Sequence, residues 1–134
     1  MIPFPNKKYQ LLYVDPPWSY NNKTIRGGAY NHYETMSLKD IQDLPVQDIC
    51  EDNCVLFMWV TMPLLQEGLD TIKSWGFKYN TCGFSWIKTN KDGNIFKGLG
   101  HTTRGNCELC LVGKKGKGFL AHSSRFRHPG LPVV

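Results

Sequence analysis

The feature that most constrains the fold is a short apolar run that ends abruptly at two prolines. Residues 9–14 read YQLLYV and are followed by Asp15, Pro16 and Pro17. A run of this length with almost no polar residue is typical of a strand buried on both faces of a sheet. Proline cannot continue a hydrogen-bonded ladder, so the strand must stop there. The sequence predicts a buried strand over 9–14 with functional residues at its carboxyl end.

Two helices are predicted from their end signals. Ser37 and Asp40 form a capping-box pattern, with Asp in place of Glu, for a short helix over 37–44 that Pro45 closes. Thr61 can cap a second helix that has Pro63 in its first turn and runs through Ile72. Gly76 stands just past its end, as at many helix termini.

Further extended segments alternate with these helices. Residues 55–60 (VLFMWV) predict a second buried strand, 77–88 and 106–112 predict two more, and 90–93 predict a turn. The alternation favours an α/β fold with a mixed sheet, and ligands would bind beyond the carboxyl ends of its strands.

Composition limits the possible classes of protein. The 134 residues fit one domain, and 41% hydrophobic with 20% charged residues is a globular balance. No run approaches the roughly 18 apolar residues of a membrane helix, and Pro3 and Pro5 interrupt any signal-peptide core. We expect a cytoplasmic protein, with a nuclear location as the alternative. A net charge of +5 favours a polyanionic partner such as nucleic acid.

The cysteines and histidines give no metal site. Cys50 and Cys54 form Cx3C, and Cys107 and Cys110 form CxxC, which together could ligate one zinc ion. The second pair lies in the apolar run CELCLV, so buried free thiols are the favoured interpretation. The four histidines share no metal-ligand spacing: His32, His101, His122 and His128.

The tetrapeptide after the first strand has the composition needed to hold an aromatic amine. Such an amine is a poor nucleophile until hydrogen-bond acceptors hold its N–H groups. Asp15 offers a carboxylate acceptor, and the carbonyl between Pro16 and Pro17 is a rigid second one with no neighbouring donor. Trp18 offers a flat face for a base. The alternative is a rigid turn in which Trp18 is a core anchor.

Several motifs occur in order along the chain: YVDPPW at 13–18, YETMS at 33–37, VLFMWVT at 55–61, WGFKYN at 75–80, FSWIKTN at 84–90 and GLGHTTRGNCELCLVGKKG at 98–116. This series resembles the MT-A70-like N6-adenine methyltransferases, which include eukaryotic RNA and DNA enzymes and bacterial and phage DNA enzymes. The resemblance covers about residues 9–116. It implies one domain over 1–134, with a Rossmann-like mixed sheet of the class I S-adenosylmethionine-dependent methyltransferases and a diverged tail over 117–134.

The resemblance also implies residue roles. The catalytic motif would be Asp15, Pro16, Pro17 and Trp18, with Asp15 and Pro16 also close to the cofactor S-adenosylmethionine. Residues that would line the substrate cleft are Tyr33, Trp86, Lys88, Arg104 and Glu108. A base removed from its stack gains about 1–3 kcal/mol from each aromatic partner, which suits Tyr33 and Trp86. For Trp59 and Trp75, core packing is the favoured interpretation.

The expected partner is nucleic acid, with DNA favoured over RNA because the compact single-domain form, without extra RNA-binding modules, resembles the bacterial and phage branch of the family, and a bacterial or phage-encoded protein is accordingly favoured. A homodimer or heterodimer is also expected as an option. The lysines in GKKGKG, Lys114, Lys115 and Lys117, predict a flexible solvated loop, with phosphate contact as the alternative. Residues 18–33 predict a mobile binding loop or lid.

The chain departs from the family after Phe119. His128, Pro129 and Gly130 stand where family members have Lys-Pro-Asp, and the later cofactor-binding motifs are absent. We therefore expect an apparently C-terminally truncated member with an incomplete cofactor site, or one completed by a partner. The alternative function is a catalytically incomplete nucleic-acid-binding or partner subunit. Methylation of a small molecule or a protein glutamine is a third reading, which Trp18 and the basic balance disfavour.

Overall fold

The computed structural model describes residues 4–19, 35–98, 100 and 102–118. Two short 3-10 helices precede β2 and α2. In chain order the elements are β1 (Tyr9–Val14), α1 (Leu38–Gln42), η2 (Val46–Ile49), β2 (Cys50–Thr61), η3 (Met62–Leu64), α2 (Leu65–Ser74), β3 (Lys78–Trp86) and β4 (Glu108–Lys115).

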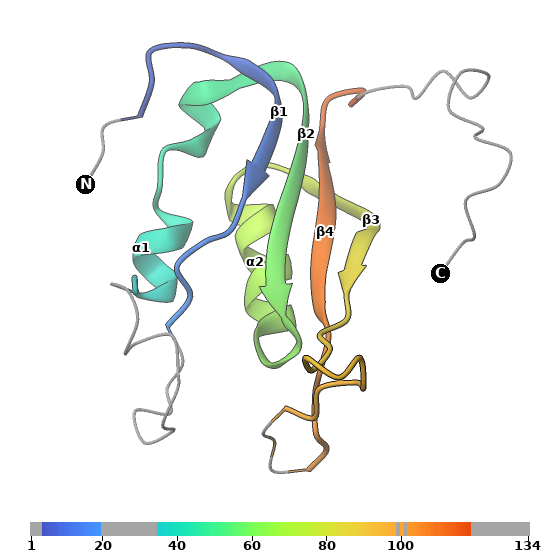
Figure 1. The fold of residues 1–134 in the computed structure, drawn as a ribbon. Coiled ribbons are helices and arrows are strands. Elements are labelled where there is room, and N and C mark those ends of the chain that lie inside the picture. The colour runs from blue at the N-terminus through green and yellow to red at the C-terminus, as the bar shows by residue number, and fades with distance from the viewer. Residues whose placement is uncertain (1–3, 20–34, 99, 101, 119–134) are drawn as a thin grey trace, which may run out of the picture.

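The strands form one mixed sheet in the order β1-β2-β4-β3 (Figure 1). β1 and β2 are parallel, whereas β4 is antiparallel to both of its neighbours. Glu108 at the start of β4 pairs with Thr61 on one side and with Trp86 on the other. The carboxyl ends of the other three strands therefore meet at one edge of the sheet, and the predicted mixed α/β fold is confirmed.

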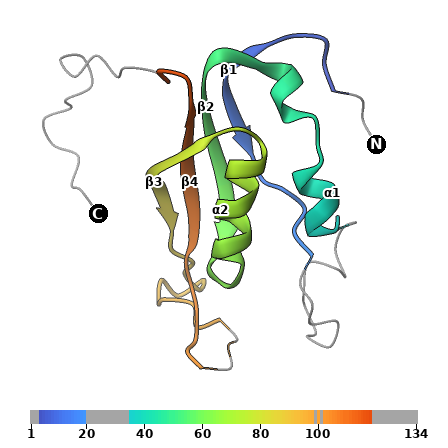
Figure 2. The same ribbon diagram turned by 180° about the vertical axis from the view of Figure 1, so that it is seen from behind.

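Helix α2 covers one face of this sheet; it lies behind the strands in Figure 1 and in front of them in Figure 2. The core fills this side and includes Leu12, Leu56, Met58, Ile72 and Leu111.

On the other face, within the described residues, Leu11 is 49% exposed and Tyr13 is 63% exposed. The expectation that β1 is buried on both faces is therefore wrong for the described part of the chain, because the helices there cover one face of the sheet.

The local end signals operate as predicted. Ser37 caps α1, because its Oγ accepts a hydrogen bond from the Asp40 N–H and donates one to the Asp40 carboxylate. Gly76 follows α2 with φ +80°, a backbone conformation that glycine adopts without steric cost. Trp75, 3% exposed, donates its indole N–H to the Ile41 carbonyl and so ties α2 to α1. Core packing of Trp75 is confirmed.

The GKKGKG segment is not the flexible loop that its composition suggested. β4 continues through Lys114 and Lys115, and the turn comes at Gly116, where φ is +62°. The strand persists because β4 is an inner strand: Lys114 pairs with Val55 and Lys78, and Lys115 pairs with Cys54. After the turn, the Lys117 N–H donates to the Asn53 side chain.

Candidate active site

Asp15 lies immediately after β1, at the edge where the carboxyl ends of the strands meet. Partial burial raises the pKa of its carboxyl above the usual value, and the negative charge of Glu108 raises it further. Sequence separation between these two carboxylates is large, so the antiparallel pairing of β4 is what brings them into electrostatic contact. Ionisation of Asp15 is therefore less favourable than ionisation of an exposed aspartate.

The carbonyls of Pro16 and Pro17 both accept backbone hydrogen bonds, whereas the carbonyl between the two prolines was predicted to have no neighbouring donor. The Pro16 carbonyl accepts the Trp18 N–H at 2.8 Å, so it has a neighbouring donor after all. The Pro17 carbonyl accepts the Met36 N–H at 2.9 Å, which joins the motif to the start of the next segment. Because a carbonyl oxygen has two lone pairs, the Pro16 oxygen keeps one for another donor.

Trp18 is a core residue in this structure. Its side chain is 5% exposed and its indole N–H donates to the Trp59 carbonyl at 3.1 Å. The expectation that Trp18 offers a flat face to a base is not met here, because the ring is used to pack the motif against β2. Within the described residues Trp18 is instead a core anchor, which was the alternative interpretation.

Lys88 and Glu108 form an ion pair beside Trp86. The Lys88 ammonium bonds to a Glu108 carboxylate oxygen and lies 5.0 Å from the centre of the Trp86 ring. Both charged side chains are partly shielded, with 35% and 21% of their surface exposed. A charge on an otherwise apolar strand needs such a partner. The structure therefore brings together three of the predicted site residues, Trp86, Lys88 and Glu108, and the charge of Glu108 also acts on Asp15.

An aromatic row, defined here as Tyr13, Trp59 and Trp86, crosses the sheet face that is not covered by the described helices. The Trp59 indole N–H donates to the Tyr13 hydroxyl at 2.7 Å, and the Trp59 and Trp86 rings meet edge to face at 6.5 Å. Core packing was the favoured interpretation for Trp59, yet its side chain is only partly buried on this face. Tyr13 was not singled out from the sequence, although its alternation with Leu12 along β1 was a usable signal.

The remaining predicted residues divide into two groups. Arg104 is exposed on the connection before β4, and no contact with another site residue is found for it in the part of the chain that the structure describes. Tyr33 and nearly all of the predicted 18–33 loop lie outside the described residues, as does the tail from 119 onward.

The lysines of β4 lie at the opposite edge of the sheet from Asp15. Lys115 pairs with Cys54, near the start of β2, and Lys114 pairs with Lys78 at the start of β3. Since β4 has eight residues and a strand rises about 3.4 Å per residue, Lys115 is roughly 24 Å from Glu108. These lysines are therefore too distant to contact the same nucleotide as Asp15.

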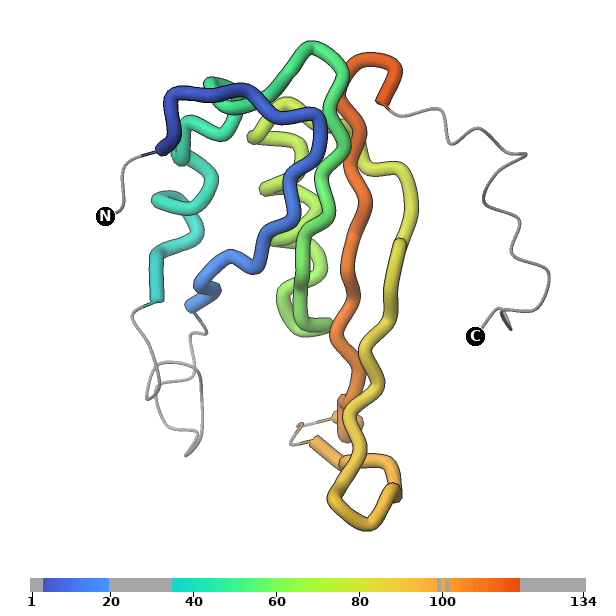
Figure 3. Tube along the Cα trace, turned by 45° about the horizontal axis from the view of Figure 1, so that its top comes forward, coloured from blue at the N-terminus to red at the C-terminus, as the bar shows by residue number. Residues whose placement is uncertain are grey.

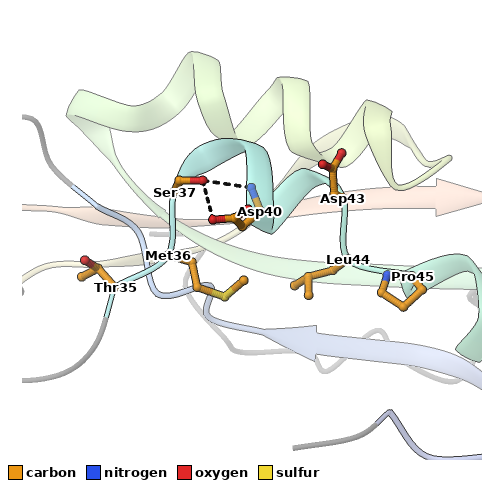
Figure 4. Close-up of a pocket in the computed structure, with 7 residues that line it drawn as sticks. All are labelled: Thr35, Met36, Ser37, Asp40, Asp43, Leu44 and Pro45. Carbon is orange, nitrogen blue, oxygen red and sulfur yellow. Dashed lines mark hydrogen bonds between the residues drawn. The ribbon is translucent and has the colours of Figure 1, made fainter. Parts of the chain in front are cut away.

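A hollow of about 420 Å³ lies beside the motif, along the segment that enters and leaves α1 (Figure 4). Its lining residues are Thr35, Met36, Ser37, Asp40, Asp43, Leu44 and Pro45. Met36 connects this hollow to the motif through its backbone bond to Pro17. Asp15, Lys88 and Glu108 do not line it. The charged site is instead at the sheet edge.

The thiols are free. Cys50, Cys54 and Cys110 are buried, and burial raises the pKa of Cys54 to about 12 and of Cys110 to about 11. No group of three potential metal ligands is found among the described residues. None of the described helices has the length and apolar character required to cross a bilayer.

Comparison with known proteins identifies the architecture. The MT-A70 family model matches residues 9–130, further than Gly116, where the motif series ended. The chain belongs to the MT-A70 family. Its mixed sheet and helices are the α/β fold of the class I S-adenosylmethionine-dependent methyltransferases.

Individual MT-A70 relatives are aligned over most of this chain. The Type II methyltransferase M.MunI of Mycoplasma sp is 37% identical over 131 residues, which cover 84% of this chain and 54% of that protein. The N6-adenosine-methyltransferase non-catalytic subunit MTB of Arabidopsis thaliana is 34% identical over 116 residues, covering 81% and 14%. The catalytic subunit METTL3 of Homo sapiens is 28% identical over 111 residues, covering 81% and 18%. The chain thus spans about half of M.MunI and less than a fifth of the other two.

Proposed function

We propose that this MT-A70 chain transfers a methyl group from S-adenosylmethionine to the N6 amine of adenine in a nucleic acid. The observation that carries the proposal is the partly desolvated Asp15 carboxylate, which lies at the carboxyl edge of the sheet within electrostatic reach of Glu108, the partner of Lys88. The relatives METTL3, an N6-adenosine methyltransferase, and M.MunI, a Type II methyltransferase, support it.

The residues at this edge fit the chemistry of the cofactor. S-adenosylmethionine supplies an electrophilic methyl group on a positively charged sulfur. Asp15 is a carboxylate that favours a nearby cation, whereas Glu108 and the Trp86 ring already face the Lys88 ammonium. We assign Asp15 and Pro16 to the cofactor side of the site.

Asp15 would hold the target amine. Its carboxylate accepts one N–H of the amine, which localises the nitrogen lone pair, and the free lone pair of the Pro16 carbonyl accepts the other. Pro17 and Trp18 fix this geometry through the Met36 and Trp59 contacts. No strong base is required, because the amine loses its proton after attack. Positioning and preorganised charge therefore supply the catalysis.

Trp86 and Lys88 would hold the substrate base and backbone. Trp86 is 53% exposed, so a flipped adenine can stack on it, and Lys88 provides the nearby positive charge. Tyr33 and Arg104 are assigned to the same cleft by their places in the family motifs. DNA is the proposed polymer, and the cytoplasm the proposed location, where free thiols such as those of this chain persist.

A second candidate is a non-catalytic partner subunit in a dimer. The relative MTB is named a non-catalytic subunit, and the Pro16 carbonyl of this chain is already bonded to the Trp18 N–H. Such a subunit would bind nucleic acid or a partner chain without transferring methyl groups. The two candidates differ in one measurable property, the formation of N6-methyladenine.

The deciding experiment measures methyl transfer by the purified chain. Adenine-containing double-stranded DNA, single-stranded DNA and RNA are incubated with labelled S-adenosylmethionine, and the nucleosides are separated by mass spectrometry. We expect labelled N6-methyladenine in DNA, and no incorporation of label into oligonucleotides whose adenines already carry the N6-methyl group. Cofactor binding in calorimetric titration without any product would support the non-catalytic candidate, and neither binding nor product would refute the proposal.

The pH dependence of transfer should report the charge of Glu108. Asp15 must be ionised to accept the amine N–H, so activity falls as the pH drops through its raised pKa. In Glu108→Gln the opposing negative charge is gone, so the pKa of Asp15 falls and the acidic limb of kcat/KM moves to lower pH. A limb that stays in place in Glu108→Gln would show that another group controls it.

A further inference from the structure

The Asn106 side chain makes three hydrogen bonds to the main chain where β3 and β4 separate. Its Oδ1 accepts the Lys88 N–H at 2.8 Å, and its Nδ2 donates to the Lys88 carbonyl at 2.8 Å. The same Nδ2 also donates to the Phe96 carbonyl. Every hydrogen of the amide is used, and only this orientation of oxygen and nitrogen satisfies all three contacts.

These contacts extend the sheet past its last backbone pair. Trp86 and Glu108 are the final partners of the β3–β4 ladder. Continuing the same antiparallel register by two residues places Lys88, which follows β3, opposite Asn106, which precedes β4. Main-chain pairing has stopped there, and the Asn106 amide takes its place with one donor and one acceptor facing Lys88. Asn106 thus fixes the backbone of Lys88 in strand-like register.

The hairpin beyond this point depends on the same residue. The Lys88 carbonyl also accepts the Phe96 N–H at 3.0 Å, and Thr89 pairs with Ile95. Asn106 therefore joins the hairpin over 88–96 to the start of β4. Figure 3 shows this connection projecting beyond the sheet edge, where the Gly98 N–H also donates to the Gly105 carbonyl at 3.0 Å.

We propose that Asn106 is a positioning residue for methyl transfer, which acts by holding Lys88 so that its ammonium pairs with Glu108 and lies over Trp86. This inference rests on the proposed function. The residue roles implied by the family motifs do not include Asn106, and its side chain is directed at main-chain groups, not at the open site. Its effect on the reaction is therefore transmitted through Lys88.

A double-mutant cycle separates this role from a general effect on folding. Asn106→Ala should lower kcat/KM by roughly 100-fold, the loss expected when a site group is displaced by about 1 Å. In a Lys88→Met background the same substitution should have little further effect, because the group it positions is already absent. Equal losses in both backgrounds would overturn the proposal.

Two controls complete the test. Asn94→Ala removes a side-chain hydrogen bond to Asp92 in the same hairpin without touching Lys88, so it should leave kcat/KM unchanged. Hydrogen exchange gives a readout that needs no activity: the Lys88 amide proton should exchange faster in Asn106→Ala and remain protected in Asn94→Ala. Unchanged protection of Lys88 would refute the positioning role. Absence of methyl transfer by the unsubstituted chain would instead refute the proposed function, and the exchange result would still decide the role of Asn106.

Discussion

Replacing Asp15 by asparagine should lower the rate of methyl transfer by roughly 10²- to 10³-fold, the loss typical of one preorganised hydrogen-bonding group at a reaction centre. Asparagine has nearly the same shape, but its amide oxygen is a weaker acceptor than a carboxylate. The adenine amine would then keep its lone pair delocalised in the ring. Single-turnover measurement of N6-methyladenine formation, with cofactor and substrate both saturating, gives the rate directly.

The same substitution should leave the fold intact and slightly raise its thermal midpoint at neutral pH. The Asp15 pKa is raised in the folded state, so ionisation is less favourable there than in the unfolded chain. That penalty grows as the pH rises from the unfolded pKa through the folded one, and is absent at lower pH. The asparagine side chain cannot ionise, so the midpoint gain should vanish in acid.

Asp92→Asn is the matched control for this prediction. The Asp92 carboxyl is fully exposed at the hairpin tip, and its hydrogen bonds from Asn94 lower its pKa. Replacing the Asp92 carboxylate should therefore lower the thermal midpoint at neutral pH, and it should leave the rate of methyl transfer unchanged. If Asp15→Asn and Asp92→Asn had equal rates, Asp15 would have no role in the chemistry.

The elements that the sequence predicted well depend on local signals. β1 has the bounds 9–14 that its apolar run predicted, because Pro16 and Pro17 cannot continue a hydrogen-bonded ladder. The Ser37 cap and the glycine after α2 act within one helical turn of their own positions. The family motifs placed Lys88 and Glu108 in one cleft, and the ion pair agrees with this.

What the sequence did not show depends on how distant segments pair. The antiparallel direction of β4 places Glu108 beside Asp15 and Lys115 at the other edge, and no local pattern sets that direction. A Gly/Lys-rich composition predicted a loop at 113–118, but the neighbours of β4 extend the strand into it. The role of Asn106 likewise depends on a partner 18 residues away in the sequence.

Trp18→Ala should lower the free energy of unfolding by about 3–5 kcal/mol, the usual cost of removing a buried large aromatic side chain. The indole is 5% exposed and belongs to the core cluster, and its loss also leaves the Trp59 carbonyl without that donor. This is a large part of the roughly 5–15 kcal/mol by which most domains are stable. Urea denaturation followed by circular dichroism measures the change.

Trp75→Ala separates the loss of stability expected in Trp18→Ala from its effect on activity. Trp75 is similarly buried and also donates its indole N–H to a carbonyl, that of Ile41, but this bond ties α2 to α1 and not to the Asp15 motif. Both variants should therefore lose similar stability. Activity per folded molecule should fall only in Trp18→Ala, because there the loop that carries Asp15 and Pro16 loses its attachment to β2. If Trp18→Ala instead lost activity with no change in the free energy of unfolding, Trp18 would be a stacking face for the substrate, and its burial against β2 would not describe the working site.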